Sequence, residues 1–142
     1  MKIKEYNSNA DFMSHEKEFI NSNNAETLLI VPDETEVIYG ADGSCNEEWC
    51  KENNIPCFHK PLLQGGGCIV SVKGNVLLDV KRKQNGGECL SDVFAKALCE
   101  FLEGKGLSSV RTDNNDVLVD GYKVASGCES TINGWQYMGY QI

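Results

Sequence analysis

The side chains best suited to chemistry gather in residues 113–128, where a polar Asp-Asn-Asn-Asp run precedes an apolar stretch. Asp120-Gly121 predicts a tight two-residue turn, because both residue types tolerate positive φ. Lys123 follows this turn, so a hairpin would bring it back toward the polar residues Asn114, Asn115 and Asp116. One cation among carboxamides and a carboxylate suits a nucleotide or acyl-phosphate ligand. An ordinary charged surface hairpin is the alternative.

A second candidate site is the run of three glycines, Gly65, Gly66 and Gly67, which precedes a predicted strand. Glycines let a backbone approach a ligand closely and present unobstructed N–H groups to it. The run is not a Walker phosphate loop or a dinucleotide fingerprint, because no Gly-Lys-Ser/Thr follows and a strand comes next. A tight bend entering that strand is the alternative. His59 and Lys60 either place a cation beside the glycines or lie on the solvated surface.

Composition narrows the classes of partner. The chain has 142 residues, a net charge of −8 and 41% hydrophobic content, as expected of a globular protein of ordinary domain size. An acidic chain argues against nucleic acid as a direct partner, because phosphate neutralisation needs a basic face. No apolar run approaches the ~20 residues of a membrane span, and the N-terminus lacks the apolar core of a signal peptide. We therefore expect a cytoplasmic protein without a membrane partner.

The seven cysteines include no CxxC pair, and neither histidine lies at zinc-ligand spacing from a cysteine pair. We interpret the cysteines as reduced, small and mostly buried apolar residues. A structural metal site is the alternative. A catalytic thiol is disfavoured, because no oriented base is visible beside any cysteine.

Apolar periodicity predicts three helices, at residues 9–21, 44–53 and 88–103, with Asn9 and Ser44 as N-caps of the first two. Strands are predicted at residues 2–6, 27–31, 36–39, 55–59, 68–72, 76–80, 107–111, 117–119, 122–128 and 135–142. We expect one domain over residues 1–142. Its fold class is α+β (mixed α/β), with a mainly antiparallel sheet flanked by about three helices.

Segments in a fixed order carry a resemblance to a known family. The first segment, TEVIYGADGSCNEEW, is the looser match. The second segment is NNIPCFHKPLLQGGGCIVSVKGN. This second segment is similar to a family segment that contains Arg-Arg-x-x-Gly-Gly-Gly-Ala-Val and ends in Gly-Asn. The last two are NNDVLVDGYKVASGC, similar to an Asn-Asp and a Lys-Ile/Val-x-Gly-Ser-Ala motif, and GWQYMGYQI, similar to an aromatic strand with His-Gly-Thr-Leu-Leu. Over residues 9–142 the chain resembles the catalytic domain of lipoate–protein ligases, in the biotin/lipoate ligase superfamily.

The resemblance implies that the chain is a minimal, divergent member of this family with a biotin/lipoate-ligase-like fold. Such proteins condense lipoate or octanoate with ATP and Mg²⁺ to an acyl-adenylate, and pass the acyl group to a lysine of a lipoyl carrier domain. It implies that Lys123 is the catalytic residue, at the carboxylate of the acid. The other implied ligand-binding residues are Gly65, Gly66, Gly67, Asn75, Asn115, Asp116 and Ser126, with Asp116 also a candidate Mg²⁺ ligand. Cys68, Val70 and Leu77 are implied as walls of an acyl tunnel, and a separate accessory chain as a possible partner.

The sequence departs from the family pattern at charged positions. The paired arginines before the glycines fall on Pro61 and Leu62, and the histidine before the last glycine falls on Met138. The Gly-Ser after the lysine is inverted to Ser126-Gly127. A substitute cation would have to come from Lys60, His59 or elsewhere in the chain.

Two functions follow from these departures. With Lys60, His59 or Lys73 directed at the glycines, we expect an active ligase or acyltransferase. With Lys123 alone, or with a pocket filled by Leu62, Leu63 and Met138, we expect a catalytically impaired relative. Such a relative would bind a lipoyl, biotinyl or adenylate ligand, or a carrier protein.

Overall fold

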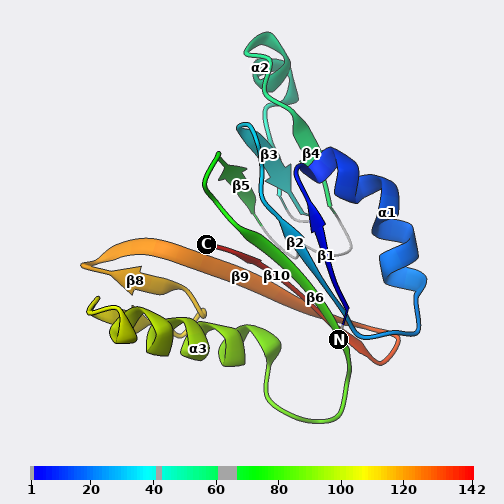
Figure 1. The fold of residues 1–142 in the computed structure, drawn as a ribbon. Helices are drawn as coiled ribbons and strands as arrows, with labels where there is room; N and C mark the ends of the chain where they lie inside the picture. Colours follow the sequence, from blue (N-terminus) through cyan, green and yellow to red (C-terminus); the bar gives the residue numbers. More distant parts are fainter. Residues whose placement is uncertain (1, 41–42, 61–66) are drawn as a thin grey trace.

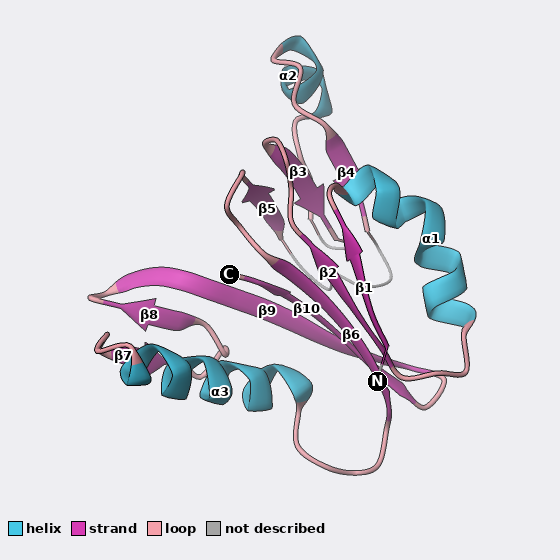
Figure 2. Cartoon of the chain, in the orientation of Figure 1, coloured by secondary structure: helices cyan, strands magenta, loops and turns pink. Residues whose placement is uncertain are grey.

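The computed structural model describes residues 2–40, 43–60 and 67–142, and it confirms the predicted α+β class. The larger of two sheets has seven strands, in the order β1-β2-β6-β10-β9-β8-β7 (Figures 1 and 2). These are β1 (Lys2–Tyr6), β2 (Glu26–Ile30), β6 (Leu77–Lys83), β10 (Trp135–Gln141), β9 (Tyr122–Ile132), β8 (Val117–Val119) and β7 (Ser109–Arg111). The β1–β2 pair is parallel, and the other neighbours in this sheet are antiparallel.

The smaller sheet has the order β4-β3-β5. Its strands are β4 (Cys57–His59), β3 (Glu36–Tyr39) and β5 (Cys68–Ser71). β3 is parallel to β4 and antiparallel to β5. Since β4 precedes the glycine run and β5 follows it, this sheet positions both ends of that segment.

Helix α1 (Asn9–Asn21) has the predicted bounds but a different cap. Ser8 is the N-cap instead of Asn9, because Ser8 Oγ accepts a hydrogen bond from Asp11 N at 3.1 Å. Asn9 is fully buried, and its side chain donates to Glu36 Oε2 at 2.6 Å. The polar residue at the helix start therefore ties α1 to β3.

Helix α2 (Glu47–Glu52) is shorter than predicted and begins after Asn46 instead of Ser44. Asn46 Oδ1 accepts a hydrogen bond from Trp49 N at 3.0 Å, which satisfies a free amide of the first turn. Helix α3 (Leu90–Gly104) agrees with its prediction to within two residues. None of the described helices is both long and apolar enough to cross a membrane.

Two strands run further than their apolar pattern predicts. β6 continues through the charged residues Lys81, Arg82 and Lys83, and Lys83 pairs with Trp135 of β10. β9 continues to Ile132, which pairs with the same tryptophan. β10 lies between β6 and β9 and pairs with both, which holds their polar ends in the sheet. Pairing with a neighbouring strand therefore outweighs local composition at these ends.

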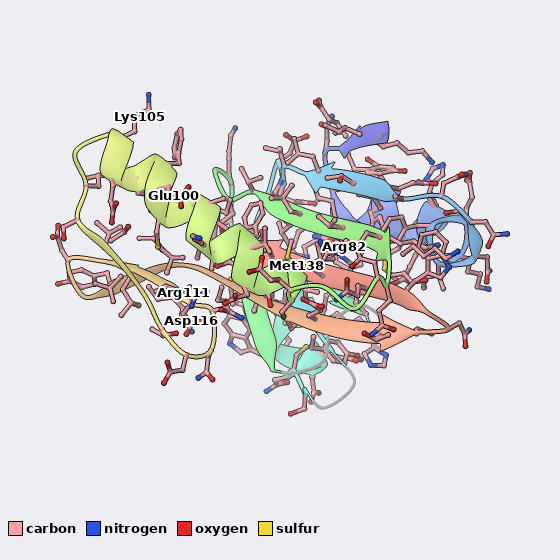
Figure 3. All side chains as sticks on the ribbon, turned by 90° about the horizontal axis from the view of Figure 1, so that it is seen from below. Arg82, Glu100, Lys105, Arg111, Asp116 and Met138 are labelled. Carbon is pink, nitrogen blue, oxygen red and sulfur yellow. The ribbon has the colours of Figure 1, made fainter. Side chains whose placement is uncertain are left out.

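Consecutive residues of β10 point to opposite faces of the larger sheet and separate two cores. Tyr137 belongs to the core beneath α1, with Phe12, Phe19, Leu28, Ile30, Ile38 and Leu77. Met138 belongs to the core beneath α3, with Leu90, Ala95, Val117, Ala125 and Tyr140 (Figure 3). Helices α1 and α3 therefore cover opposite faces of the sheet. The smaller sheet lies on the α1 face, since Ile38 of β3 joins the first core.

Candidate functional site

The predicted hairpin forms with its turn at Asp120-Gly121, where φ is 51° and 80°. Lys123 pairs with Leu118 across the ladder, and a register shift follows between Val117 and Leu118. Lys123 Nζ lies 2.9 Å from Asp116 Oδ2, and the lysine side chain is 57% exposed. An ion pair so exposed contributes little to stability, so the ammonium group is free to exchange this carboxylate for that of a ligand.

Asn115 fixes the position of the hairpin instead of facing solvent. Its φ is 62°, a left-handed conformation that asparagine tolerates. Its carbonyl oxygen accepts a hydrogen bond from Tyr140 Oη at 2.7 Å, and its side chain donates to Ser91 Oγ at 3.2 Å. Burial raises the pKa of Tyr140 to about 12, and the nearby carboxylate of Asp116 adds to the rise. Tyr140 is therefore a neutral hydrogen-bond donor, and Asn115 is bound to protein groups on both sides.

A cleft lies between β5 of the smaller sheet and the α1 face of the larger sheet. Its inner part, about 220 Å³, is lined by Ile69, Leu77, Ser126, Gly127, Cys128, Gly139, Tyr140 and Gln141. Its outer part, about 370 Å³, is lined by Ile69, Val70, Asn75, Lys123, Val124, Ala125, Ser126, Gln141 and Ile142. Ile69, Ser126 and Gln141 belong to both parts, so the two form one continuous hollow. Its inner end is mostly apolar, and Lys123 lies at its outer end.

Several predicted site residues meet at this cleft. Lys123, Asn75 and Ser126 line the outer part, Ser126 also lines the inner part, and Val70 and Leu77 supply apolar wall. Cys68 is exposed and lies outside both linings. The prediction of Cys68 as tunnel wall is therefore wrong, and Ile69 and Val70, further along β5, line the cleft instead.

Asn75 shapes the turn between β5 and β6. Its Oδ1 atom accepts hydrogen bonds from Val72 N at 2.8 Å and from Gln141 Nε2 at 3.1 Å. Its Nδ2 atom donates to the carbonyl of Ile142 at 3.3 Å. The side chain thus joins the turn to the end of β10 along the outer rim of the cleft.

The one described glycine of the run, Gly67, adopts a φ of 55°. Its carbonyl oxygen accepts a hydrogen bond from Gly40 N at 3.3 Å. A Cβ atom on Gly43 would lie only 2.0 Å from that same oxygen, so only glycine fits there. Gly65 and Gly66 lie outside the described residues, as do Pro61, Leu62 and Leu63.

The two predicted substitute cations beside the glycines are engaged elsewhere. Lys60 is fully buried, and its Nζ lies 3.1 Å from Asp79 Oδ2 and 4.2 Å from the centroid of the Phe12 ring. The His59 ring stacks on Tyr39, with centroids 4.6 Å apart and an interplanar angle of 18°. Lys60 therefore points into the α1 core, where Asp79 neutralises it. The prediction of Lys60 at the ligand is wrong.

Lys123 is the only charged residue among the described residues that line either part of the cleft. Met138 does not fill the cleft, because it lies in the α3 core on the opposite face. Of the two arrangements expected for an impaired relative, filling by Met138 therefore does not occur. Leu62 and Leu63 lie outside the described residues.

A polar network at the start of α3 was not apparent from the sequence. Glu129 Oε2 accepts hydrogen bonds from Ser91 N at 3.0 Å and from Cys89 Sγ at 2.9 Å. Glu129 Oε1 accepts one from Gln136 Nε2 at 3.1 Å. Glu129 lies in β9, and its partners come from the start of α3 and from β10. No local motif marks residues that meet only through the tertiary fold.

Comparison with known proteins identifies the family of this chain. The family model described as the lipoyl protein ligase A/B catalytic domain matches residues 9–142. The chain belongs to this family. The predicted resemblance is thereby confirmed over a range that includes the smaller sheet, the cleft and the Lys123 hairpin. A comparison of the sequence with curated proteins finds no match.

Solved ligase structures share the fold. LipL1 of Plasmodium falciparum, in complex with lipoate, superposes with a TM-score of 0.76 at 16% identity, over 100% of this chain and 47% of that one. A bi-partite lipoate protein ligase of Thermoplasma acidophilum, described with its E2 lipoyl domain, gives 0.75 at 17% identity, over 99% and 59%. Lipoate-protein ligase A bound with ATP gives 0.71 at 15% identity, over 100% and 66%. The chain spans about half to two thirds of the length of these ligases.

Proposed function

We propose that this protein binds a lipoyl or octanoyl acid in the cleft, activates it with ATP, and transfers the acyl group to a lysine of a lipoyl carrier domain. The supporting observation is the placement of Lys123 at the outer end of a cleft whose inner end is mostly apolar. A fatty acid has this same division, with a carboxylate at one end and a hydrocarbon chain behind it. Family membership supports the same reading.

The cleft assigns separate tasks to its residues. Ile69, Val70 and Leu77 would contact the acyl chain, and burying the roughly seven hydrocarbon carbons of octanoate there would contribute about 6 kcal/mol, at ~0.8 kcal/mol per CH₂ group. Lys123 would release Asp116 and hold the carboxylate of the acid, and would stabilise the charge that develops as the carboxyl carbon is attacked. The Ser126 hydroxyl lies beside both parts of the cleft and would orient the carboxyl end.

ATP and Mg²⁺ are the cosubstrate and ion that this reaction needs. Asp116 fits Mg²⁺ in type, because the ion is commonly held by one or two carboxylates together with substrate phosphates and water. Gly65, Gly66 and Gly67 would present backbone N–H groups to phosphate oxygens, with Asn75 at the nucleotide end. Asn115, which is hydrogen-bonded to Ser91 and Tyr140, would position Asp116 at that end. The carboxylate of the acid would attack the α-phosphate of ATP, which forms the acyl-adenylate and releases pyrophosphate, and AMP would leave when the carrier lysine attacks the carboxyl carbon. The chain's own task is to hold both substrates and exclude water.

Two of the ligases that share the fold support the choice of ligands and partner. One was solved with lipoate, and another is a bi-partite enzyme described with its E2 lipoyl domain. We extend this to a lipoyl carrier domain as the acceptor and to a separate accessory chain as a partner. A cytoplasmic location, expected from the sequence, stays a prediction.

The test is a transfer assay with the purified chain, ATP, Mg²⁺, a lipoyl carrier domain, and lipoate, octanoate or biotin. We expect the intact mass of the carrier to increase by one acyl group and AMP to appear, with lipoate or octanoate as the acid. A carrier whose acceptor lysine is replaced by arginine, and a reaction without ATP, are the controls. A carrier that stays unmodified with every acid, with no AMP formed, contradicts the ligase function.

A second function, binding without activation, is favoured by the placement of Lys60. With Lys60 paired to Asp79, Lys123 is the only charged residue among the described residues of the cleft. One cation can hold a carboxylate, whereas a triphosphate needs more positive charge. Calorimetry separates the two functions: heat on mixing with lipoate, together with no AMP formation, indicates a non-catalytic binder. No binding to any acid contradicts both.

A further inference from the structure

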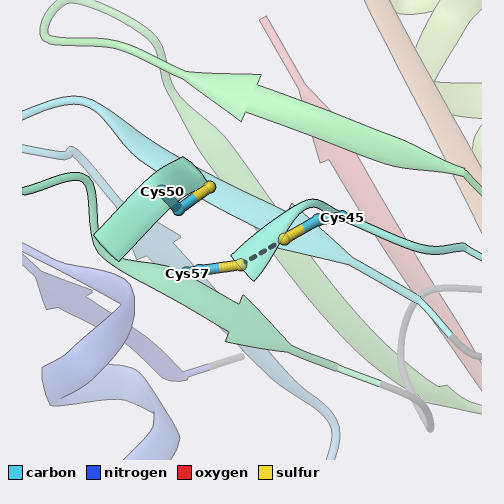
Figure 4. Close-up of side chains that lie close together, drawn as sticks. All are labelled: Cys45, Cys50 and Cys57. Atoms are coloured by element: carbon cyan, nitrogen blue, oxygen red, sulfur yellow. Dashed lines mark hydrogen bonds between the residues drawn. The ribbon is translucent and has the colours of Figure 1, made fainter. Parts of the chain in front are cut away.

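Three cysteines that are separated in sequence meet at the base of α2. The Sγ atoms of Cys45, Cys50 and Cys57 all lie within 4.8 Å of one another (Figure 4). Cys45 precedes α2, Cys50 lies within it, and Cys57 begins β4. Cys50 is buried and the other two are half-buried. Three separate segments therefore direct sulfur toward one point.

We propose that Cys45, Cys50 and Cys57 bind one thiophilic metal ion, of which Zn²⁺ is the representative, as a structural site independent of the acyl chemistry. Zn²⁺ bonds to thiolate sulfur at about 2.3 Å, so two sulfurs on a tetrahedral ion lie about 3.8 Å apart. All three sulfur pairs lie within 4.8 Å, so small side-chain rotations would bring the three sulfurs to this spacing. The fourth position of the tetrahedron would be taken by water or another oxygen or nitrogen ligand.

The Cys45–Cys57 sulfur distance is longer than in a disulfide and shorter than in a metal-bound thiolate pair. Cys45 Sγ and Cys57 Sγ are 2.7 Å apart, longer than the ~2.05 Å of a disulfide bond. The ion would separate these two sulfurs by about 1 Å, a shift within reach of side-chain rotation. Cys50, the third sulfur, has no role in a Cys45–Cys57 disulfide, whereas a metal site uses all three.

Helix α2 needs stabilisation that its own side chains do not supply. It has six residues and projects from the body of the molecule (Figure 1). An isolated helix of this length is not stable in water. Cys50 is its one buried side chain, and Trp49 beside it is 51% exposed. A metal ion held by Cys50 together with Cys45 and Cys57 would anchor α2 to the segment that precedes the helix and to β4.

Proton balance is part of the proposed binding step. Burial raises the pKa of the Cys57 thiol to about 12, and the adjacent Cys45 thiol adds to the rise. The metal-free Cys57 thiol therefore keeps its proton at neutral pH. On binding, each coordinating thiol gives its proton to the buffer, and Zn²⁺ with three thiolates carries a net charge of −1.

Two of the three proposed ligands lie in segments that are connected to the glycine run. Cys45 follows Gly43, which lies against the carbonyl of Gly67, and Cys57 belongs to the strand that leads toward the glycines. Anchoring both segments would restrict the motion of the smaller sheet. We therefore expect the ion to raise thermal stability whether or not the chain activates an acid.

The test measures metal binding directly. The chain is purified with reductant, its zinc content is determined, and Co²⁺ is titrated into the metal-free protein. We expect about one zinc per chain, a thiolate-to-cobalt charge-transfer band, and a higher Tm with metal. Cys45→Ser, Cys50→Ser and Cys57→Ser should each weaken binding. Cys68→Ser and Cys99→Ser, outside the cluster, should leave it unchanged.

Three results would overturn the proposal. The first is the absence of a charge-transfer band when Co²⁺ is added to the reduced parent protein, a measurement that needs no variant to fold. The second is equal zinc content in the parent and in Cys57→Ser. Alkylation followed by mass spectrometry distinguishes the rival state: a stable Cys45–Cys57 disulfide that persists in reductant also contradicts a metal site.

Discussion

Two lysines of this chain show how far the surroundings of a residue determine its use. Lys60 is fully buried against Asp79 and beneath the Phe12 ring, so its charge is compensated within the core. Lys123 is mostly exposed, and its partner Asp116 is 20% exposed. Water weakens the second pair but not the first. Only Lys123 is therefore able to change partners when a carboxylate enters the cleft.

Replacing Lys123 tests its role at the carboxylate. A hydrogen bond to a charged group contributes about 1.5–3 kcal/mol, so Lys123→Ala should weaken lipoate binding by about tenfold to a hundredfold. Titration calorimetry measures the affinity, and the Tm should hardly change because the side chain is exposed. Lys105→Ala, on the far end of α3, is the matched control and should bind like the parent. Unchanged affinity in Lys123→Ala would remove this lysine from the site.

Glu16 carries a prediction about pH. Its Oε1 atom is buried without a hydrogen-bond partner, and burial raises its pKa above the ordinary value of 4.5, against the opposing attraction of Lys60. The folded state therefore binds this proton more tightly than the unfolded state. The resulting stabilisation is present below pH 4.5 and is lost as the pH rises through the folded-state pKa.

Glu16→Gln should therefore be more stable than the parent at pH 7, because glutamine carries no buried charge. The difference in unfolding free energy should shrink toward pH 4, where the parent carboxyl is protonated. Urea denaturation at several pH values measures it, with the exposed Glu100→Gln as the control. A variant less stable than the parent at pH 7 would mean that attraction to Lys60 outweighs the cost of burial.

At the scale of elements, buried polar groups fix how the helices and sheets meet. Glu36 of β3 accepts hydrogen bonds from the backbone and side chain of Asn9, which holds the start of α1. Lys81 of β6 donates to the carbonyls of Phe19 and Ile20 at 2.8 and 2.9 Å, which holds the end of α1. The negative charge of Glu36 thus lies at the N-terminus of α1 and the positive charge of Lys81 at its C-terminus, and the helix dipole favours both placements.

The Lys60–Asp79 pair joins the end of β4 to β6, and breaking it should be costly. Lys60→Met leaves a buried carboxylate without its partner, so we expect a loss of about 3–5 kcal/mol in unfolding free energy. The double variant Lys60→Met/Asp79→Leu removes both charges and should be more stable than Lys60→Met alone. Urea denaturation of the singles and the double completes the cycle. Additive losses would show that the two charges do not depend on each other.

At the scale of the molecule, the cleft exists because the smaller sheet stands beside one face of the larger one. The wall on the larger sheet requires Gly127, because a Cβ atom there would lie 2.1 Å from Tyr140 Cδ2 and 2.8 Å from the Gly139 carbonyl oxygen. Tyr140 cannot easily move away, since it is buried and bonded to Asn115. The tyrosine thus joins the cleft wall to the core beneath α3.

Gly127→Ala should therefore affect both stability and binding. Overpacking of a close contact costs about 1–3 kcal/mol, and displacement of Tyr140 would shift the cleft wall and lower lipoate affinity. Thermal unfolding and calorimetry measure the two effects. Gly104→Ala, at the end of α3 with no atom within 4 Å of the added methyl group, is the control and should be neutral or slightly stabilising. A Gly127→Ala protein that matches the parent in both would show that the wall yields without cost.

Local signals in the sequence were enough for the elements and the family. Positive-φ residues set the turn at Asp120-Gly121, apolar periodicity set α1 and α3, and the ordered motifs led to the ligase family. The turn, the helices and each separate motif lie within short segments, so neighbouring residues are enough to predict them. The charged end of β6 and the polar end of β9 were missed, because pairing with β10 holds them in the sheet.

Tertiary structure alone decided which side chains share a site. Lys60 and Lys123 are the same residue type near predicted site segments, yet Asp79, 19 positions away in sequence, draws only the first into the core. Likewise, the spacing of Cys45, Cys50 and Cys57 matches no metal motif, and their sulfurs meet only because α2 folds back onto β4. Charge compensation and sulfur proximity depend on distances between remote segments. Linear spacing does not encode such distances, and the packing of the two sheets sets them.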